Sequence, residues 1–116
     1  MSLIQISEIQ EGQTPVTVFE IRGRINLGNY KDLEQAAQQA CDRGVRNLVL
    51  DFSGLDSLTS IGIRTLITVH KMLEKNEGGK LKLAGVIPPI RDMFEMAGVA
   101  QFLDLHDTTA EAVAAF

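Results

Sequence analysis

Residues 47–70 read NLVLDFSGLDSLTSIGIRTLITVH and contain a complete strand–loop–helix pattern. The first six form a nearly continuous apolar run, which is typical of a strand covered on both faces. A segment rich in Asp, Ser, Thr and Gly follows and predicts a loop. Apolar residues then recur at helical spacing from Ile61 to Lys75. Ser60 therefore stands where the helix is expected to begin.

The other elements are predicted from apolar spacing and turn residues. Before the central stretch we expect strands at 4–9 and 15–21, joined by a turn at 11–14, and a helix at 29–43, with Gly23 ending the second strand. After it we expect a strand at 80–84, a helix at 89–97, a short strand at 102–105 and a last helix capped by Asp107 or Thr108. This order predicts one α/β domain over residues 1–116, with a mixed, mostly parallel sheet, an N-terminal antiparallel hairpin and about four helices.

Composition excludes several classes of protein. The chain has 116 residues, enough for one core, and a formal net charge of −4 with 5% aromatic residues. Nucleic-acid binding is not expected, because it needs clustered basic residues or stacking aromatics. The single cysteine, Cys41, excludes an internal disulfide and is expected to be a half-buried small hydrophobe. Without a long apolar run or a signal-peptide pattern, we expect a cytoplasmic location and no membrane insertion.

Few residues could form a catalytic site. His70 lies about 15 Å along the helix from Ser60, too far for a nucleophile–base pair, and the neighbours of His106 suggest no catalytic role. Nucleophile-elbow, P-loop and dinucleotide motifs are absent. Asp51 and Asp56 could hold a divalent cation, but a strand end and a turn explain them better. We therefore expect a protein that is not an enzyme, with no catalytic residue, metal or cofactor.

Ser60 has two possible roles at the start of its helix. Its hydroxyl can cap the helix, or it can carry a phosphate beside free N–H groups and the positive end of the helix dipole. Gly62 follows two residues later and costs a helix about 1 kcal/mol relative to Ala. It either lets a partner's backbone approach closely or packs against a neighbouring strand.

The segments Leu50–Gly54 (LDFSG) and Thr59–Ile63 (TSIGI) together resemble the STAS domain of anti-sigma factor antagonists. Residues 21–26 (IRGRIN), 80–86 (KLKLAGV) with 89–91 (PIR), and 97–102 are similar to further segments of that family. The resemblance covers nearly the whole chain in the element order given above. It implies a STAS fold.

The resemblance also implies a mechanism. In this bacterial family, an anti-sigma factor that is also a serine kinase phosphorylates a serine at the start of the second helix, and a metal-dependent serine phosphatase removes the phosphate. The unphosphorylated domain binds the kinase and frees the sigma factor. Alignment on Gly62 makes Ser60 the phosphoacceptor, with Thr59 a less favoured alternative. Thr59 stands where the family usually has Asp, and Ile61 stands where it has Ser or Thr. Asn26 likewise replaces the family's usual Asp.

A partner-binding surface around this serine is implied as well. Its expected members are Asn26, Asp56, Ser57, Thr59, Ser60, Ile61, Gly62 and Arg64. A phosphate there adds about −1.5 to −2 charges, which the helix N-terminus tolerates and a matched partner surface repels. The alternative is a STAS accessory subunit of a transporter or lipid-transport complex, in which Ser60 is only a cap.

Overall fold

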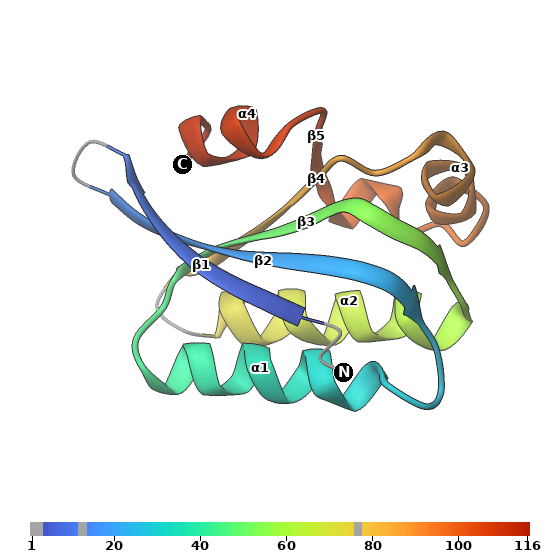
Figure 1. The fold of residues 1–116 in the computed structure, drawn as a ribbon, viewed down its shortest axis with the longest axis horizontal. Coiled ribbons are helices and arrows are strands. Elements are labelled where there is room, and N and C mark those ends of the chain that lie inside the picture. Colours follow the sequence, from blue (N-terminus) through green and yellow to red (C-terminus); the bar gives the residue numbers. More distant parts are fainter. Residues whose placement is uncertain (1–3, 12–13, 76–77) are drawn as a thin grey trace.

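In the part of the chain that the structure describes, five strands form one sheet in the order β1-β2-β3-β4-β5. The computed structural model describes residues 4–11, 14–75 and 78–116. The elements are β1 Ile4–Glu11, β2 Thr14–Ile25, α1 Tyr30–Asp42, β3 Asn47–Leu58, α2 Ser60–Glu74, β4 Lys80–Ala84, α3 Pro88–Met96, a 3-10 turn η1 Ala100–Phe102, β5 Asp104–His106 and α4 Thr109–Ala114 (Figure 1). β1 is antiparallel to β2 and the other neighbours are parallel, which confirms the predicted fold class. The tip of the predicted hairpin turn, residues 12–13, lies outside the described residues.

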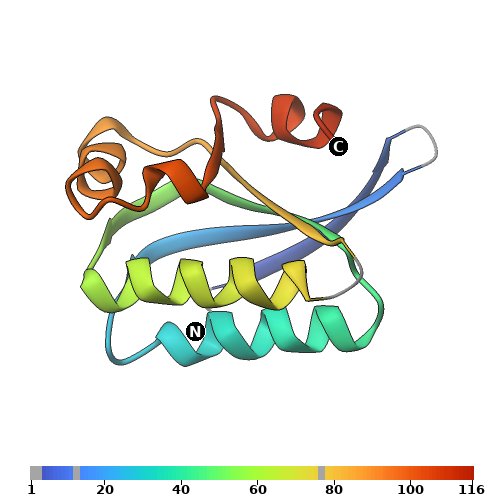
Figure 2. The ribbon, with the colours of Figure 1, turned by 180° about the vertical axis from the view of Figure 1, so that it is seen from behind.

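The helices cover the two faces of the sheet unequally. α1 and α2 lie side by side on one face, and the short α4 lies on the other (Figures 1 and 2). The main core is on the α1–α2 side and includes Phe19, Phe52 and Leu66, none of which is exposed. A smaller cluster joins Val18 and other strand residues to Val113 of α4. Cys41 is half-buried against the main core as predicted, and burial raises the pKa of its thiol.

β3 extends through the segment that was predicted to be a loop, and that prediction is wrong. The register with β2 shifts twice, and each shift places one extra residue on β3. Burial along this half of β3 recurs every third residue, at Phe52, Leu55 and Leu58, instead of alternating. The polar residues between them lie beyond the part of β3 that pairs with β4, which ends at Asp51. A bulged strand therefore carries the chain to the start of α2.

Smaller differences concern the element ends. β2 continues through Gly23, where the predicted strand ends, because this glycine adopts φ +85° within the pairing to β3. Phe102 was expected to open the last strand, but it belongs to η1. Thr108 caps α4 as predicted, since its side chain accepts a hydrogen bond from the Glu111 N–H.

Candidate functional site

The predicted site lies where β2 and β3 end together. Ile25 pairs with Leu58, and the Thr59 N–H donates to the Ile25 carbonyl at 3.1 Å. This bond holds the start of α2 beside the loop that follows β2 and begins at Asn26. In Figure 1 both segments lie at the right-hand end of the molecule, as does α3. The extended β2–β3 pair thus brings two distant parts of the sequence to one surface.

The loop after β2 is fixed by a compact set of hydrogen bonds. The Asn26 N–H donates to Asn29 Oδ1, and the Gly28 N–H donates to Asn26 Oδ1, both at 2.9 Å. Asn29 Nδ2 also donates to the Arg24 carbonyl at 2.7 Å. The side-chain oxygen of Asn26 is therefore engaged in shaping the loop. Leu27 lies between these asparagines, and 76% of it is exposed.

Ser60 is not the capping residue of α2, and that expectation is wrong. The N-cap is Thr59, which is extended (φ −94°, ψ 177°), and its side chain makes no capping hydrogen bond. The first helical bond runs from the Ile63 N–H to the Thr59 carbonyl, so Ser60 is the first residue of the helix. The cap shifts by one residue because β3 remains extended up to Leu58. Ser60 is exposed beside the unpaired N–H groups of the first turn.

Two roles were considered for Gly62, and the structure shows the second, close packing against neighbouring strands. The residue is buried, and a Cβ there would lie 3.0 Å from Leu58 Cβ and 3.2 Å from Ile25 Cγ2. The glycine thus lets α2 approach the ends of β2 and β3. Its burial places it beneath the surface that a partner would touch.

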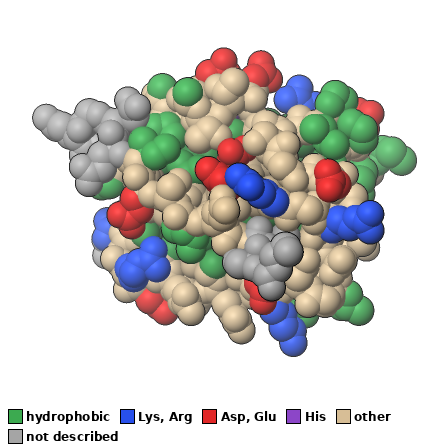
Figure 3. Space-filling view, in the orientation of Figure 1, with side chains coloured by type: hydrophobic (Ala, Val, Ile, Leu, Met, Phe, Trp, Pro, Cys, Tyr) green, Lys and Arg blue, Asp and Glu red, His purple; other side chains and the backbone are tan. Residues whose placement is uncertain are grey.

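The other predicted surface residues differ in exposure. Asp56, Ser57 and Arg64 are exposed, and Ile61 is half-buried. Two exposed apolar residues at this end were missed: Leu27, and Met96 at the end of α3, which is 89% exposed. Figure 3 shows hydrophobic side chains gathered at the right-hand end of its visible face, over α3. A lone leucine among Asn and Gly was the available sequence signal for Leu27.

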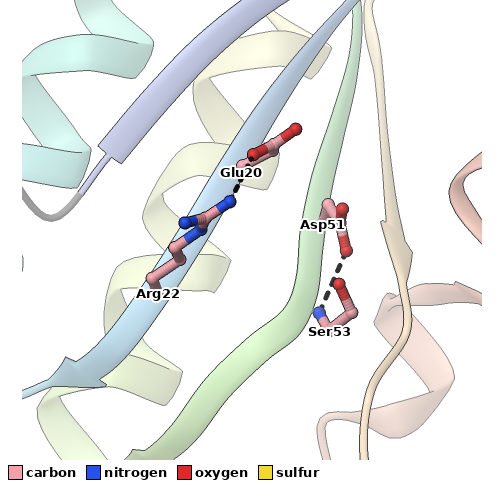
Figure 4. Close-up of polar contacts among 4 residues, drawn as sticks. All are labelled: Glu20, Arg22, Asp51 and Ser53. Atoms are coloured by element: carbon pink, nitrogen blue, oxygen red, sulfur yellow. Dashed lines mark hydrogen bonds and ion pairs between the residues drawn. The ribbon is translucent and has the colours of Figure 1, made fainter.

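Asp51 lies within β3 rather than at a strand end, as Figure 4 shows. Its Oδ1 accepts a hydrogen bond from the Ser53 N–H at 3.0 Å, and Arg22 pairs with Glu20 at 3.4 Å. These four residues line a shallow recess of about 360 Å³. Among the residues that the structure describes, no group of three or more His, Cys, Asp or Glu could hold a metal ion. The local contacts here are those of a strand surface.

The two histidines are paired away from Ser60. His70 Nε2 lies 2.8 Å from Glu74 Oε1 on α2. His106 Nε2 lies 3.0 Å from Asp104 Oδ1, an ion-pair distance without hydrogen-bond geometry. Neither histidine lines the pocket that contains Ser60. Neither histidine is therefore placed to act as a base for Ser60.

Asp104 also pairs with Lys82, which is only 7% exposed on β4. Burial raises the pKa of Asp104, but the hydrogen bond and charge of Lys82, together with His106, outweigh it and hold the pKa below its usual value. The Lys82 ammonium also lies 5.1 Å from the centre of the Phe116 ring. No sequence signal pointed to this cluster, whose contacts join β4, β5 and Phe116.

Comparison with known proteins gives consistent results. The family model described as the STAS domain matches residues 8–112. BtrV of Bordetella bronchiseptica, named as a candidate anti-sigma factor antagonist, is 32% identical over 96 residues, covering 83% of this chain and 82% of BtrV.

Solved structures show the same fold. The phosphorylated form of the Bacillus cell fate determinant SpoIIAA aligns with a TM-score of 0.72 and 18% identity, covering 97% of each chain. An anti-sigma factor antagonist from Mycobacterium paratuberculosis aligns with a TM-score of 0.78 and 23% identity, covering 96% of this chain and 93% of the other. SpoIIAA has also been solved unphosphorylated. No helix within the described ranges is long and apolar enough to cross a membrane.

Proposed function

The chain belongs to the STAS domain family, and we propose that it is an anti-sigma factor antagonist controlled by phosphorylation of Ser60. Its partner is an anti-sigma factor with serine kinase activity, and a metal-dependent serine phosphatase resets it. The protein is not an enzyme itself, consistent with a family of generally non-enzymatic regulators. We further propose that residues 1–116 form one STAS domain acting in the cytoplasm, where sigma factors work.

The observation that carries this proposal is the position of Ser60. Its hydroxyl is exposed in the first turn of α2, and Thr59, not Ser60, is the N-cap residue. Phosphorylation therefore removes no capping hydrogen bond from the fold. The free N–H groups and the helix dipole favour an anion at this point.

Release follows from the same charge once a partner is docked. The partner-binding surface comprises Asn26, Leu27, Asp56, Ser57, Thr59, Ser60, Ile61 and Arg64. A partner matched to a neutral hydroxyl would have to bury about −1.5 to −2 charges for which it offers no counter-charge of its own. Burying an unpaired charge costs a few kcal/mol, so we expect affinity to fall about a hundredfold or more.

Intact-mass spectrometry tests the phosphorylation step. The chain is incubated with ATP and the purified anti-sigma factor kinases of its source organism. We expect one phosphate on the wild type, one on Thr59→Ala, and none on Ser60→Ala. Phosphate retained by Ser60→Ala, or no phosphate on the wild type with any of these kinases, would contradict the proposal.

A further inference from the structure

A groove runs along α2 from Ser60, on the side facing the segment that follows α3. Its volume is about 450 Å³. Ser60 and Lys71 mark the two ends of its α2 wall, and Ala97 and Val99 form the facing wall. Ser60 and Lys71 are eleven residues apart on the helix, which corresponds to about 16 Å or about three helical turns. The groove is therefore long enough for a short helical segment of another protein.

The floor of the groove is apolar. Ile63 and Ile67 lie one turn apart on α2, and both are half-buried and pack against the main core. Val99 is also half-buried against that core, whereas Ala97 is exposed. Exposed Met96 precedes Ala97 in the chain. This arrangement suits an apolar stripe on an amphipathic helix.

The charges that line the groove are all positive. They are Arg64 and Lys71, and both side chains are exposed. Among the described residues, neither forms an ion pair with a carboxylate. The chain as a whole carries a formal net charge of −4, so this local sign is opposite to that of the molecule. Electrostatic complementarity therefore favours a partner segment with acidic side chains.

We propose that this groove binds an amphipathic helix of the anti-sigma factor, with an apolar stripe over Ile63 and Ile67 and acidic side chains paired with Arg64 and Lys71. The proposal rests on the proposed function, which supplies the partner. It also gives Ser60 an electrostatic neighbour, because Arg64 lies four residues later on the same helix. A phosphate on Ser60 would pair with Arg64 and repel the partner's acidic residues at that end of the groove.

Two synthetic stapled helices test the groove without the natural partner. They share one leucine stripe and carry either Glu or Lys on its flanks, and each is titrated into the ¹⁵N-labelled full chain. We expect the Glu peptide to bind about tenfold more tightly and to shift the amide signals of Ile63, Ile67 and Val99. Equal affinities, no binding of the Glu peptide, or shifts confined to other surfaces would overturn the proposal.

Charge reversal provides the matched control. The double variant Arg64→Glu/Lys71→Glu should bind the Lys peptide more tightly than the Glu peptide. If this variant does not fold, Arg64→Gln/Lys71→Gln replaces it and should bind the two peptides equally. Lys31→Glu/Lys80→Glu changes the net charge equally at exposed residues outside the groove and should preserve the preference. If the Arg64 and Lys71 variants still bound the Glu peptide more tightly than the Lys peptide, the proposed binding to the groove would be refuted.

The natural partner separates this inference from the proposed function. An anti-sigma factor that binds the wild type and the Arg64→Glu/Lys71→Glu variant equally would refute the groove and the place of Arg64 in the partner-binding surface, while leaving control by phosphorylation of Ser60 intact. Conversely, the chain could bind the Glu peptide more tightly than the Lys peptide and yet be phosphorylated by no anti-sigma factor. This result would refute the proposed function and leave the groove intact.

Discussion

Ser60 and Thr108 show how similar hydroxyls at the starts of two helices differ in their contacts. Thr108 Oγ1 accepts a hydrogen bond from the Glu111 N–H at 3.1 Å and caps α4. Ser60 stands inside the first turn of α2, one residue after the N-cap. The sequence predicts Ser60 as the phosphoacceptor, but the exact position of this residue in the helix depends on where β3 stops being extended.

Alanine substitutions distinguish these two hydroxyls. Thr108→Ala should lower the free energy of unfolding by about 1 kcal/mol, because the cap is lost. Ser60→Ala should change it by no more than about 0.5 kcal/mol, as expected for an exposed residue without a capping bond. Urea unfolding measures both. A loss at Ser60 as large as that at Thr108 would contradict the assigned positions.

Gly62 is required by close packing. Gly62→Ala would gain about 1 kcal/mol of helix propensity. Its new Cβ would lie 3.0 Å from Leu58 Cβ and 3.1 Å from Leu58 Cδ1, and overpacking of this kind costs about 1–3 kcal/mol. We therefore expect a net loss of about 1 kcal/mol in urea unfolding. Gln35→Ala, at an exposed site on α1, is the neutral control, and a Gly62→Ala protein more stable than wild type would contradict the packing account.

Only the first half of β3 is recognisable as a strand in the sequence. The apolar run of residues 47–52 predicts its first half. Two extra residues relative to β2 then leave only every third residue buried, so the second half shows neither a continuous apolar run nor the alternation that identifies a strand. Ser53, Gly54, Asp56 and Ser57 consequently resemble a loop. The pairing with β2, a contact between distant residues, keeps this segment extended.

The loop between β2 and α1 depends on Asn29. Asn29→Ala removes the acceptor of the Asn26 N–H and the donor to the Arg24 carbonyl, so we expect a loss of about 1–3 kcal/mol in unfolding free energy. Asn29→Asp keeps the acceptor and should lose less. Chemical denaturation compares the two. Equal losses would show that the Nδ2 bond to Arg24 carries the effect alone, and no loss in either would contradict the role of this residue.

At the scale of the molecule, the order of strands and helices followed from apolar spacing, and the antiparallel edge followed from the short hairpin. The contacts that attach the last elements to the rest of the fold did not follow from the sequence. Lys82 appears in the alternating segment KLKLA as an ordinary solvated residue, yet in the fold it is buried and paired with Asp104. Such pairing depends on β4 and β5 lying side by side, which residue order alone does not specify.

The Lys82–Asp104 pair predicts a dependence of stability on pH. The pKa of Asp104 is lowered in the folded state, so its contribution is present above the unfolded value of about 3.9 and is lost as pH falls through the folded pKa. Asp104→Asn should lower the melting temperature at pH 7, because it leaves the buried Lys82 ammonium without its counter-charge. The loss should shrink as pH falls through the lowered folded-state pKa and the wild-type carboxyl becomes neutral.

A control separates the charge from packing. Lys82→Met removes the buried charge and leaves Asp104, which remains about half exposed, in contact with water. It should therefore destabilise less than Asp104→Asn at pH 7. An Asp104→Asn protein with the same melting temperature as the wild type at pH 7 would contradict the pairing.

Control of binding by the charge on Ser60 is tested most directly by calorimetry with phosphoserine installed at this position during translation. An anti-sigma factor kinase found by mass spectrometry to phosphorylate the chain is titrated, with a non-hydrolysable ATP analogue, into the unmodified and phosphoserine-60 proteins. We predict binding of the unmodified chain and an affinity lower by about a hundredfold or more for the phosphorylated one. Equal affinities for the two forms would contradict the switch.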